Sequence, residues 1–357
     1  MLPVSDGTVA AGLTRRKRAP GKWRCDAGGS EPRPLTPEAL PARGSHESER
    51  VSGPLSVFVR RLRPLLGFVL LASVRAAVDP AGLAAARACY EGRRPEEARA
   101  AFERLAEADP SDPDVNHYLG QLANRRNEPE RAVRYFERAL AAEPQGARHY
   151  HGLGDALGRS AQNAGLLSKF GLAKKCVAAY ERAVALAPDH FDYRWSLFEY
   201  YRQAPGFAGG GKDKARGEAE AMRRIDPVRA RVAFALLHAA KEDYAAAFAE
   251  VDAALAVAPD DFVTLYHAGR LAALSGQQID AGIARLRRCL ALPVPLTPPF
   301  PDHAVAQLQL GKLLERRGDF AGAREAFTAA VALDPSLEAA SDALRRLPAA
   351  PASERAP

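Results

Sequence analysis

The chain has 357 residues, of which 47% are hydrophobic and 26% are charged, and its formal net charge is +7. This content is enough for a packed core and excludes a chain that is disordered throughout. Residues 1–78 hold 13 of the 50 Lys and Arg and 6 of the 43 Asp and Glu, so residues 79–357 hold 37 of each. The composition therefore does not indicate a basic nucleic-acid-binding face on the main body.

Residues 1–53 are rich in Gly, Pro, Ser and Arg and show no apolar periodicity. Such a composition cannot bury enough apolar surface to fold, so we predict a disordered tail or a stretch upstream of the true start. The cluster RRKR at 15–18 stands alone in this segment. It supports one alternative function, the binding of nucleic acid or another anionic polymer through the basic tail.

Residues 54–78 have the layout of a secretory signal peptide. Arginines precede an uncharged apolar run at 65–74, and small residues follow at Ala76 and Ala77. The apolar run is too short to span a bilayer as a permanent helix. We therefore expect a periplasmic or secreted protein, with 59–76 as a signal that contacts the membrane only transiently and with the start codon misassigned. The alternatives are a cytoplasmic protein and one that stays anchored in the membrane.

From residue 79 onward, seven short phrases that end in proline recur along the chain. Their spacings are 34, 44, 39, 32, 34 and 42 residues. A base period of about 34 residues, lengthened by insertions at three places, is typical of a repeat architecture. The phrases end at Pro110, Pro144, Pro188, Pro227, Pro259, Pro293 and Pro335.

Each unit of this repeat has the pattern of two helices. The run before the proline places a small residue four positions before a larger apolar one, as with Ala132 and Phe136, and this spacing puts both on one helical face. Proline then ends the helix. An earlier helix holds a pair such as Leu119 and Gly120. Because glycine inside a helix costs about 1 kcal/mol relative to alanine, its return at one place indicates close packing by the second helix.

These residues resemble the tetratricopeptide repeat (TPR), a helix-turn-helix unit of about 34 residues. The resemblance covers residues 80–347 and is clearest in the last unit. It implies an all-α solenoid, a right-handed superhelix of about seven units over 79–347, closed by a capping helix at 336–347. A disordered tail is expected at 348–357. The residues of the last unit that follow the family's register are Leu310, Gly311, Leu314, Gly318, Phe320, Ala323, Phe327, Ala330 and Pro335.

The three insertions fall at residues 158–175, 204–211 and 293–303. The first is apolar enough to pack, either as a short helix against the groove or as an extension of the next helix. The third is rich in proline and predicts a stiff extended connector. Phrases around the first two also look like those of bacterial exported TPR proteins, a group without an assigned biochemical activity.

Gly206, Gly211 and Lys212 fit the spacing of a phosphate-binding P-loop. This match gives a second alternative function, a nucleotide-binding enzyme with its site at 206–212. A Ser or Thr should follow the lysine to hold Mg²⁺, whereas this chain has Asp213. A P-loop also follows a strand, and here a helix is expected first. We therefore interpret the glycines as a turn between paired helices.

Histidine and cysteine spacings predict no metal site. The four cysteines lie singly, without a CxxC pair. His149 and His151 diverge on a helix, and His151 with Asp155 offers only two ligands. No nucleophile can be grouped with a base from the sequence, so we predict that the chain is not an enzyme and has neither catalytic residues nor a cofactor.

The TPR resemblance implies a concave groove lined by the first helix of each unit, where a protein or peptide partner binds. The groove residues mix both charge signs with aromatic rings, which favours an extended peptide or a helix over nucleic acid. We expect a non-enzymatic scaffold in the bacterial envelope, and self-stacking of the solenoid is a further alternative. The residues that the family register places on this face are His117, Gln121, Asn124, His151, Asp155, Arg159, Tyr193, Tyr200, Tyr266, Arg270 and Lys312.

Overall fold

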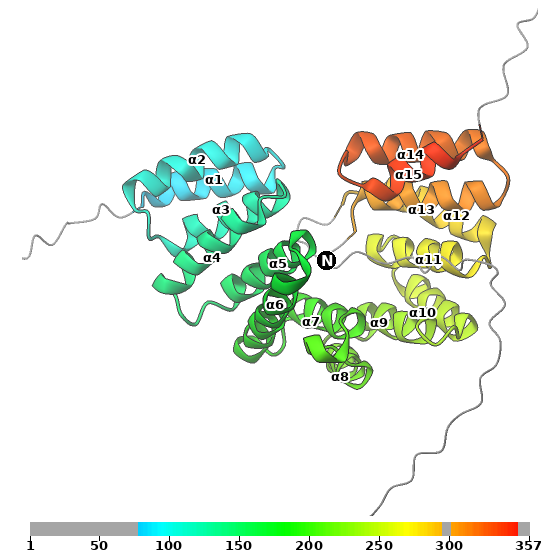
Figure 1. Cartoon of the computed structure of the whole chain (residues 1–357), viewed down its shortest axis with the longest axis horizontal. Coiled ribbons are helices and arrows are strands. Elements are labelled where there is room, and N and C mark those ends of the chain that lie inside the picture. The colour runs from blue at the N-terminus through cyan, green and yellow to red at the C-terminus, as the bar shows by residue number, and fades with distance from the viewer. Residues whose placement is uncertain (1–77, 295–300, 349–357) are drawn as a thin grey trace, which may run out of the picture. The chain divides into compact units, whose positions relative to one another are not determined.

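The computed structural model describes residues 78–294 and 301–348. Over these residues it has fifteen α-helices and one short 3-10 helix, and no strand (Figure 1). This confirms the predicted all-α fold. No helix in the described ranges has the length and apolar content needed to cross a membrane. The predicted tails and the signal-like segment lie outside the described residues, apart from Val78 and Pro348.

The helices alternate between a first and a second member of seven successive pairs (Figure 1). The first helices are α1 (Pro80–Glu91), α3 (Pro113–Arg125), α5 (Ala147–Asn163), α7 (Phe191–Gln203), α9 (Pro227–Ala239), α11 (Phe262–Ser275) and α13 (His303–Arg316). The second helices are α2 (Pro95–Ala108), α4 (Pro129–Ala142), α6 (Leu166–Leu186), α8 (Lys212–Ile225), α10 (Tyr244–Val257), α12 (Ile279–Leu290) and α14 (Phe320–Leu333). The cap α15 (Glu338–Arg346) lies within the predicted range.

Aspartate and proline fix where many of these helices begin. Asp112 accepts a hydrogen bond from the Val115 N–H at 2.8 Å, and the proline that follows Asp112 is the first residue of α3. An aspartate at this position satisfies an N–H group that the helix leaves open, and proline there loses nothing because its missing N–H has no helical partner. Between α8 and α9 only Asp226 remains, since Pro227 already starts α9. This short connection accounts for the 32-residue spacing that follows.

Every helix packs against the next one along the chain. Most first helices also contact neighbouring first helices, as in the pairs α3 with α5, α7 with α9, α9 with α11 and α11 with α13. Among the described residues no two second helices approach each other comparably. The first helices therefore form the tighter row, and we call the surface they present away from the second helices the inner face.

Glycine in the first helices makes room for a large side chain from a second helix. The ring of Phe136 on α4 is fully buried between Gly120 on α3 and Gly152 on α5. A Cβ atom would lie 2.8 Å from this ring at Gly120 and 2.3 Å from it at Gly152. The predicted packing reason for the recurring glycines is thus present, and one phenylalanine joins two consecutive units.

The first two insertions meet at the surface. The first lengthens α5 to Asn163 and α6 from Leu166, in line with the expectation that it extends the next helix, and the glycine stretch forms the 3-10 helix η1 (Gly206–Ala208). The ring of Phe170 in α6 contacts that of Phe207 edge to face, at 5.1 Å between centroids. The Tyr200 hydroxyl lies 2.8 Å from the Ala173 carbonyl and 2.6 Å from the Ala208 carbonyl. One tyrosine therefore connects both insertions.

Candidate functional site

The residues predicted to line the groove all lie on first helices, and none is fully exposed. Their binding role stays a prediction. They differ in how far their side chains are buried, and burial limits the contacts that each can make with a partner. The buried ones are Gln121, Asn124, His151, Asp155, Tyr200 and Tyr266. The half-buried ones are His117, Arg159, Tyr193, Arg270 and Lys312.

Two amide side chains on α3 have open acceptors. Gln121 and Asn124 are 7% and 4% exposed, and neither Gln121 Oε1 nor Asn124 Oδ1 has a hydrogen-bond partner within the described part of the chain. Residues three apart share one helical face, so both side chains lie on the same side of α3. Because a buried acceptor without a partner costs about 1–3 kcal/mol, a donor from a bound chain would stabilise this arrangement.

His117 and His149 face each other between α3 and α5. Their Nδ1 atoms lie 3.2 Å apart, and His149 Nε2 lies 2.8 Å from Glu143 Oε2. Burial, with the His149 charge second, holds the pKa of His117 well below its usual value. Burial also lowers the pKa of His149, although Glu143 opposes this. Both imidazoles are therefore neutral near pH 7, and each carries one donor and one acceptor.

The structure brings three of the predicted residues together at α5 and α7. The ring of His151 lies 4.8 Å from that of Tyr193, and His151 Nε2 is 2.8 Å from Ser196 Oγ. Asp155 accepts a hydrogen bond of 2.7 Å from the Tyr180 hydroxyl on α6. His149 and His151 thus point to different partners, as their spacing predicts, and the described residues hold no group of three His, Cys, Asp or Glu side chains suited to a metal ion.

A largely buried ion pair on α7 was not predicted. Glu199 and Arg202 form an ion pair of 2.8 Å with side chains 13% and 16% exposed. Burial acts to raise the pKa of Glu199, but the charge and hydrogen bonds of Arg202 outweigh it, and the pKa is lowered. Trp195 lies beside this pair on α7, with its ring 5.9 Å from that of His267 on α11. A glutamate and an arginine three positions apart, in a helix rich in aromatic residues, were the signal that the sequence contained.

His267 and Tyr266 show how strongly α11 is buried. Burial, reinforced by the Arg270 charge, lowers the pKa of His267 to about 3. Its Nδ1 atom has no partner in the ranges that the structure describes. Burial likewise raises the pKa of Tyr266 to about 12. Both side chains are uncharged at neutral pH, so Arg270 is the charged group of this helix at the inner face.

The glycine stretch has little hydrogen-bonding capacity left for a phosphate. It follows helix α7 instead of a strand. The N–H groups of Gly209, Gly210 and Gly211 donate to the carbonyls of Gly206, Pro205 and Tyr201. A phosphate-binding loop requires N–H groups that point outward. The local geometry agrees with the interpretation as a turn.

The repeat pattern, the paired helices and the glycine contacts can now be compared with known proteins. The sequence profile of the tetratricopeptide repeat family matches residues 83–147, 119–167 and 271–338. The chain contains tetratricopeptide repeats. Repeats of this family generally serve as scaffolds for interactions between proteins. A search of curated proteins gave no match.

Two solved structures are similar to this TPR protein in fold. One is a tetratricopeptide repeat protein from Parabacteroides merdae ATCC 43184, at 13% identity and a TM-score of 0.53, covering 74% of this chain and 96% of that one. The other is a chain of the APC/C hetero-tetramer Cut9-Hcn1, at 16% identity and a TM-score of 0.51. It is matched over 73% of this chain and 48% of its own length. At these identities the likeness shows the fold alone.

Proposed function

We propose that this TPR protein is a non-enzymatic scaffold that binds an extended segment of a protein partner along its inner face. The observation that supports this best is the position of buried polar atoms without a hydrogen-bond partner. Among the described residues, Gln121 Oε1 and Asn124 Oδ1 on α3 and His267 Nδ1 on α11 are such atoms, and all three lie on first helices.

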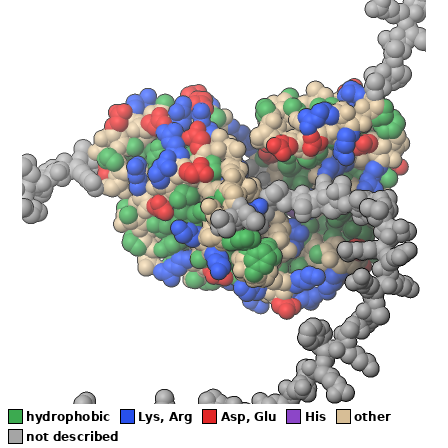
Figure 2. Space-filling model, viewed as in Figure 1, with side chains coloured by type: hydrophobic (Ala, Val, Ile, Leu, Met, Phe, Trp, Pro, Cys, Tyr) green, Lys and Arg blue, Asp and Glu red, His purple; other side chains and the backbone are tan. Residues whose placement is uncertain are grey.

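A peptide backbone is the ligand that suits such a face. Its N–H groups can donate to Gln121 Oε1 and Asn124 Oδ1 once these side chains turn outward, and the two residues lie three positions apart on α3. Figure 2 shows Lys and Arg side chains interspersed with Asp and Glu over the face in view, without a large area of one sign. A mixed surface suits a peptide with both charge signs better than a uniformly anionic polymer.

Removing the acceptor pair should separate binding from stability. Gln121→Leu with Asn124→Leu should weaken partner binding by about tenfold or more, because two peptide N–H groups lose their acceptors. The free energy of unfolding should stay the same or rise, since two buried unpaired oxygens disappear. Co-purification of the cross-linked partner and urea denaturation measure the two effects.

The matched control for this pair is Gln277→Leu, which removes an exposed amide outside the helices. It should leave partner recovery unchanged. Equal recovery with the double variant and with the unaltered protein would rule out the inner face as the binding surface.

We also propose that the scaffold acts in the bacterial envelope after export. The support is the arrangement of arginines, apolar residues and small residues in segment 59–76. Protein isolated from its native cells should begin near Ala77, as determined by N-terminal sequencing. An intact amino-terminal tail beginning at Met1 would contradict export and would favour the basic-tail alternative.

A further inference from the structure

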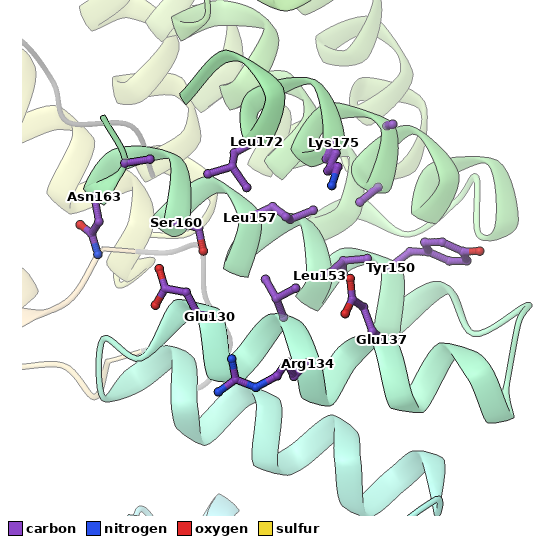
Figure 3. Close-up of a pocket in the computed structure, with 14 residues that line it drawn as sticks. Glu130, Arg134, Glu137, Tyr150, Leu153, Leu157, Ser160, Asn163, Leu172 and Lys175 are labelled. Atoms are coloured by element: carbon purple, nitrogen blue, oxygen red, sulfur yellow. The ribbon is translucent and has the colours of Figure 1, made fainter. Parts of the chain in front are cut away.

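A second candidate binding surface lies on the side of the second helices. A trough of about 670 Å³ opens between α4 and α6, with α5 beneath it (Figure 3). We call it the outer trough. Its apolar lining includes Val133 from α4, Leu153 and Leu157 from α5, and Leu172 from α6. Such an apolar surface between helices is a typical place for a ligand.

The first insertion builds part of the outer trough. Ser160, Asn163, Leu172 and Lys175 all line it, and all belong to the inserted residues 158–175. The insertion lengthens both α5 and α6, so the wall of the trough extends beyond what a regular unit would supply. The trough is therefore a local property of this insertion and not of the repeat.

A buried hydroxyl in the trough has no partner. Ser160 is 5% exposed, and its Oγ atom makes no hydrogen bond with any described residue. Figure 3 shows its side chain directed into the space between the helices. Because an unpaired buried hydroxyl is costly, a polar group of a ligand that reached this atom would be stabilised by it.

Charged side chains at the rim are unpaired as well. In the described ranges, Glu130, Arg134 and Glu137 on α4 and Lys175 on α6 form no ion pair. Arg134 follows Glu130 by four residues and precedes Glu137 by three, which are the spacings at which helical ion pairs form. The neighbouring Arg131 does pair, with Glu128 and Glu103. The four rim charges are thus free to meet charges on a partner.

The dimensions of the trough match a short helix. Seven residues separate Glu130 from Glu137, which is about 10 Å at the rise of an α-helix. Leu153 and Ser160 on α5 are separated by the same number. We propose that the outer trough binds an amphipathic helix of a partner protein, with apolar side chains at i, i+4 and i+7 on its floor. Basic residues of this helix meet Glu130 and Glu137, and an acidic residue between them meets Arg134.

The test uses the full chain and a fluorescein-labelled peptide, AKLAAELAKLAA, blocked at both ends. Its leucines follow the i, i+4, i+7 pattern, and its Lys-Glu-Lys spacing is complementary to Glu130, Arg134 and Glu137. Fluorescence anisotropy should show saturable binding that is at least about tenfold tighter than that of a scrambled peptide of the same composition. Equal binding of the scrambled peptide would overturn the proposal.

Two substitutions of exposed alanines locate the binding. Ala178 is exposed and lines the trough, so Ala178→Trp fills the space without disturbing the core and should weaken binding about tenfold or more. Ala249→Trp places the same side chain on the exposed face of α10 and should have no effect. Equal affinities for the two variants would overturn the proposal.

A charge exchange tests the rim. Glu130→Lys with Glu137→Lys should weaken binding of the peptide about tenfold, and a peptide with glutamate at both lysine positions should regain it. If light scattering instead shows a dimer that Ala178→Trp converts to monomers, the occupant is a second copy of the chain and the partner helix is excluded.

Discussion

Replacing Phe136 with alanine is expected to lower the free energy of unfolding by about 3–5 kcal/mol. The ring is fully buried against Gly120 and Gly152, and neither glycine has a side chain that can move into the space left behind. The lost apolar burial and the cavity that remains therefore both lower the free energy of unfolding. Urea denaturation followed by circular dichroism measures the loss, and hydrogen exchange should show α3, α4 and α5 opening first.

Phe320→Ala is the matched control for Phe136→Ala. Phe320 is 46% exposed at the start of α14, so its removal should change the free energy of unfolding by about 0.5 kcal/mol or less. Similar losses for the two variants would mean that the glycine and phenylalanine contacts do not hold consecutive units together.

Arg202→Ala is expected to lower the free energy of unfolding at pH 7 by about 3 kcal/mol, because it leaves Glu199 as a buried charge without its main partner. In the unaltered protein the pKa of Glu199 is lowered, so its contribution is present above the unfolded pKa and is lost as pH falls through the folded pKa. Without Arg202, burial dominates and the pKa of Glu199 rises above its usual value. The pH dependence of the contribution of Glu199 to stability then reverses. The free energy of unfolding of the variant falls as pH rises through the raised pKa of Glu199.

Denaturation curves at pH 4 and pH 7 test this reversal. The deficit of Arg202→Ala should be smaller at pH 4 than at pH 7, since protonation removes the buried charge of Glu199. The double variant Glu199→Gln with Arg202→Met should recover most of the stability at pH 7, because no uncompensated charge remains. Two results would contradict the role of Arg202 as the partner of the Glu199 charge. One is a loss of unfolding free energy in Arg202→Ala that does not change with pH, and the other is a double variant as unstable as Arg202→Ala.

The sequence predicted the fold well because its signals are local and repeated. The proline phrases and the glycine that recurs in several of the first helices depend on helix ends and on one close contact, and both follow the repeat period. Helices α7 and α8 accordingly lie on either side of the glycine stretch, which was expected to form a turn between paired helices. The cap α15 was also expected, since the last apolar surface of a solenoid has to be covered.

The candidate binding surfaces were harder to predict because they depend on contacts between units. Tyr200 was assigned to the groove, yet its hydroxyl contacts backbone carbonyls of both insertions. Glu199 and Arg202 were missed because the sequence does not define the rotation of α7 about its axis, and therefore not which of its side chains are buried. The outer trough depends on how far the first insertion extends α5 and α6, which composition alone does not define.

The link made by Tyr200 means that the two inserted segments cannot be transplanted separately. A hybrid that received the glycine stretch without the lengthened α6 would lack the Ala173 carbonyl that meets the tyrosine, and Phe207 would lose the ring of Phe170. A hybrid that received only α6 would lose the Ala208 carbonyl instead. The smallest portable module of this protein therefore spans units three and four together.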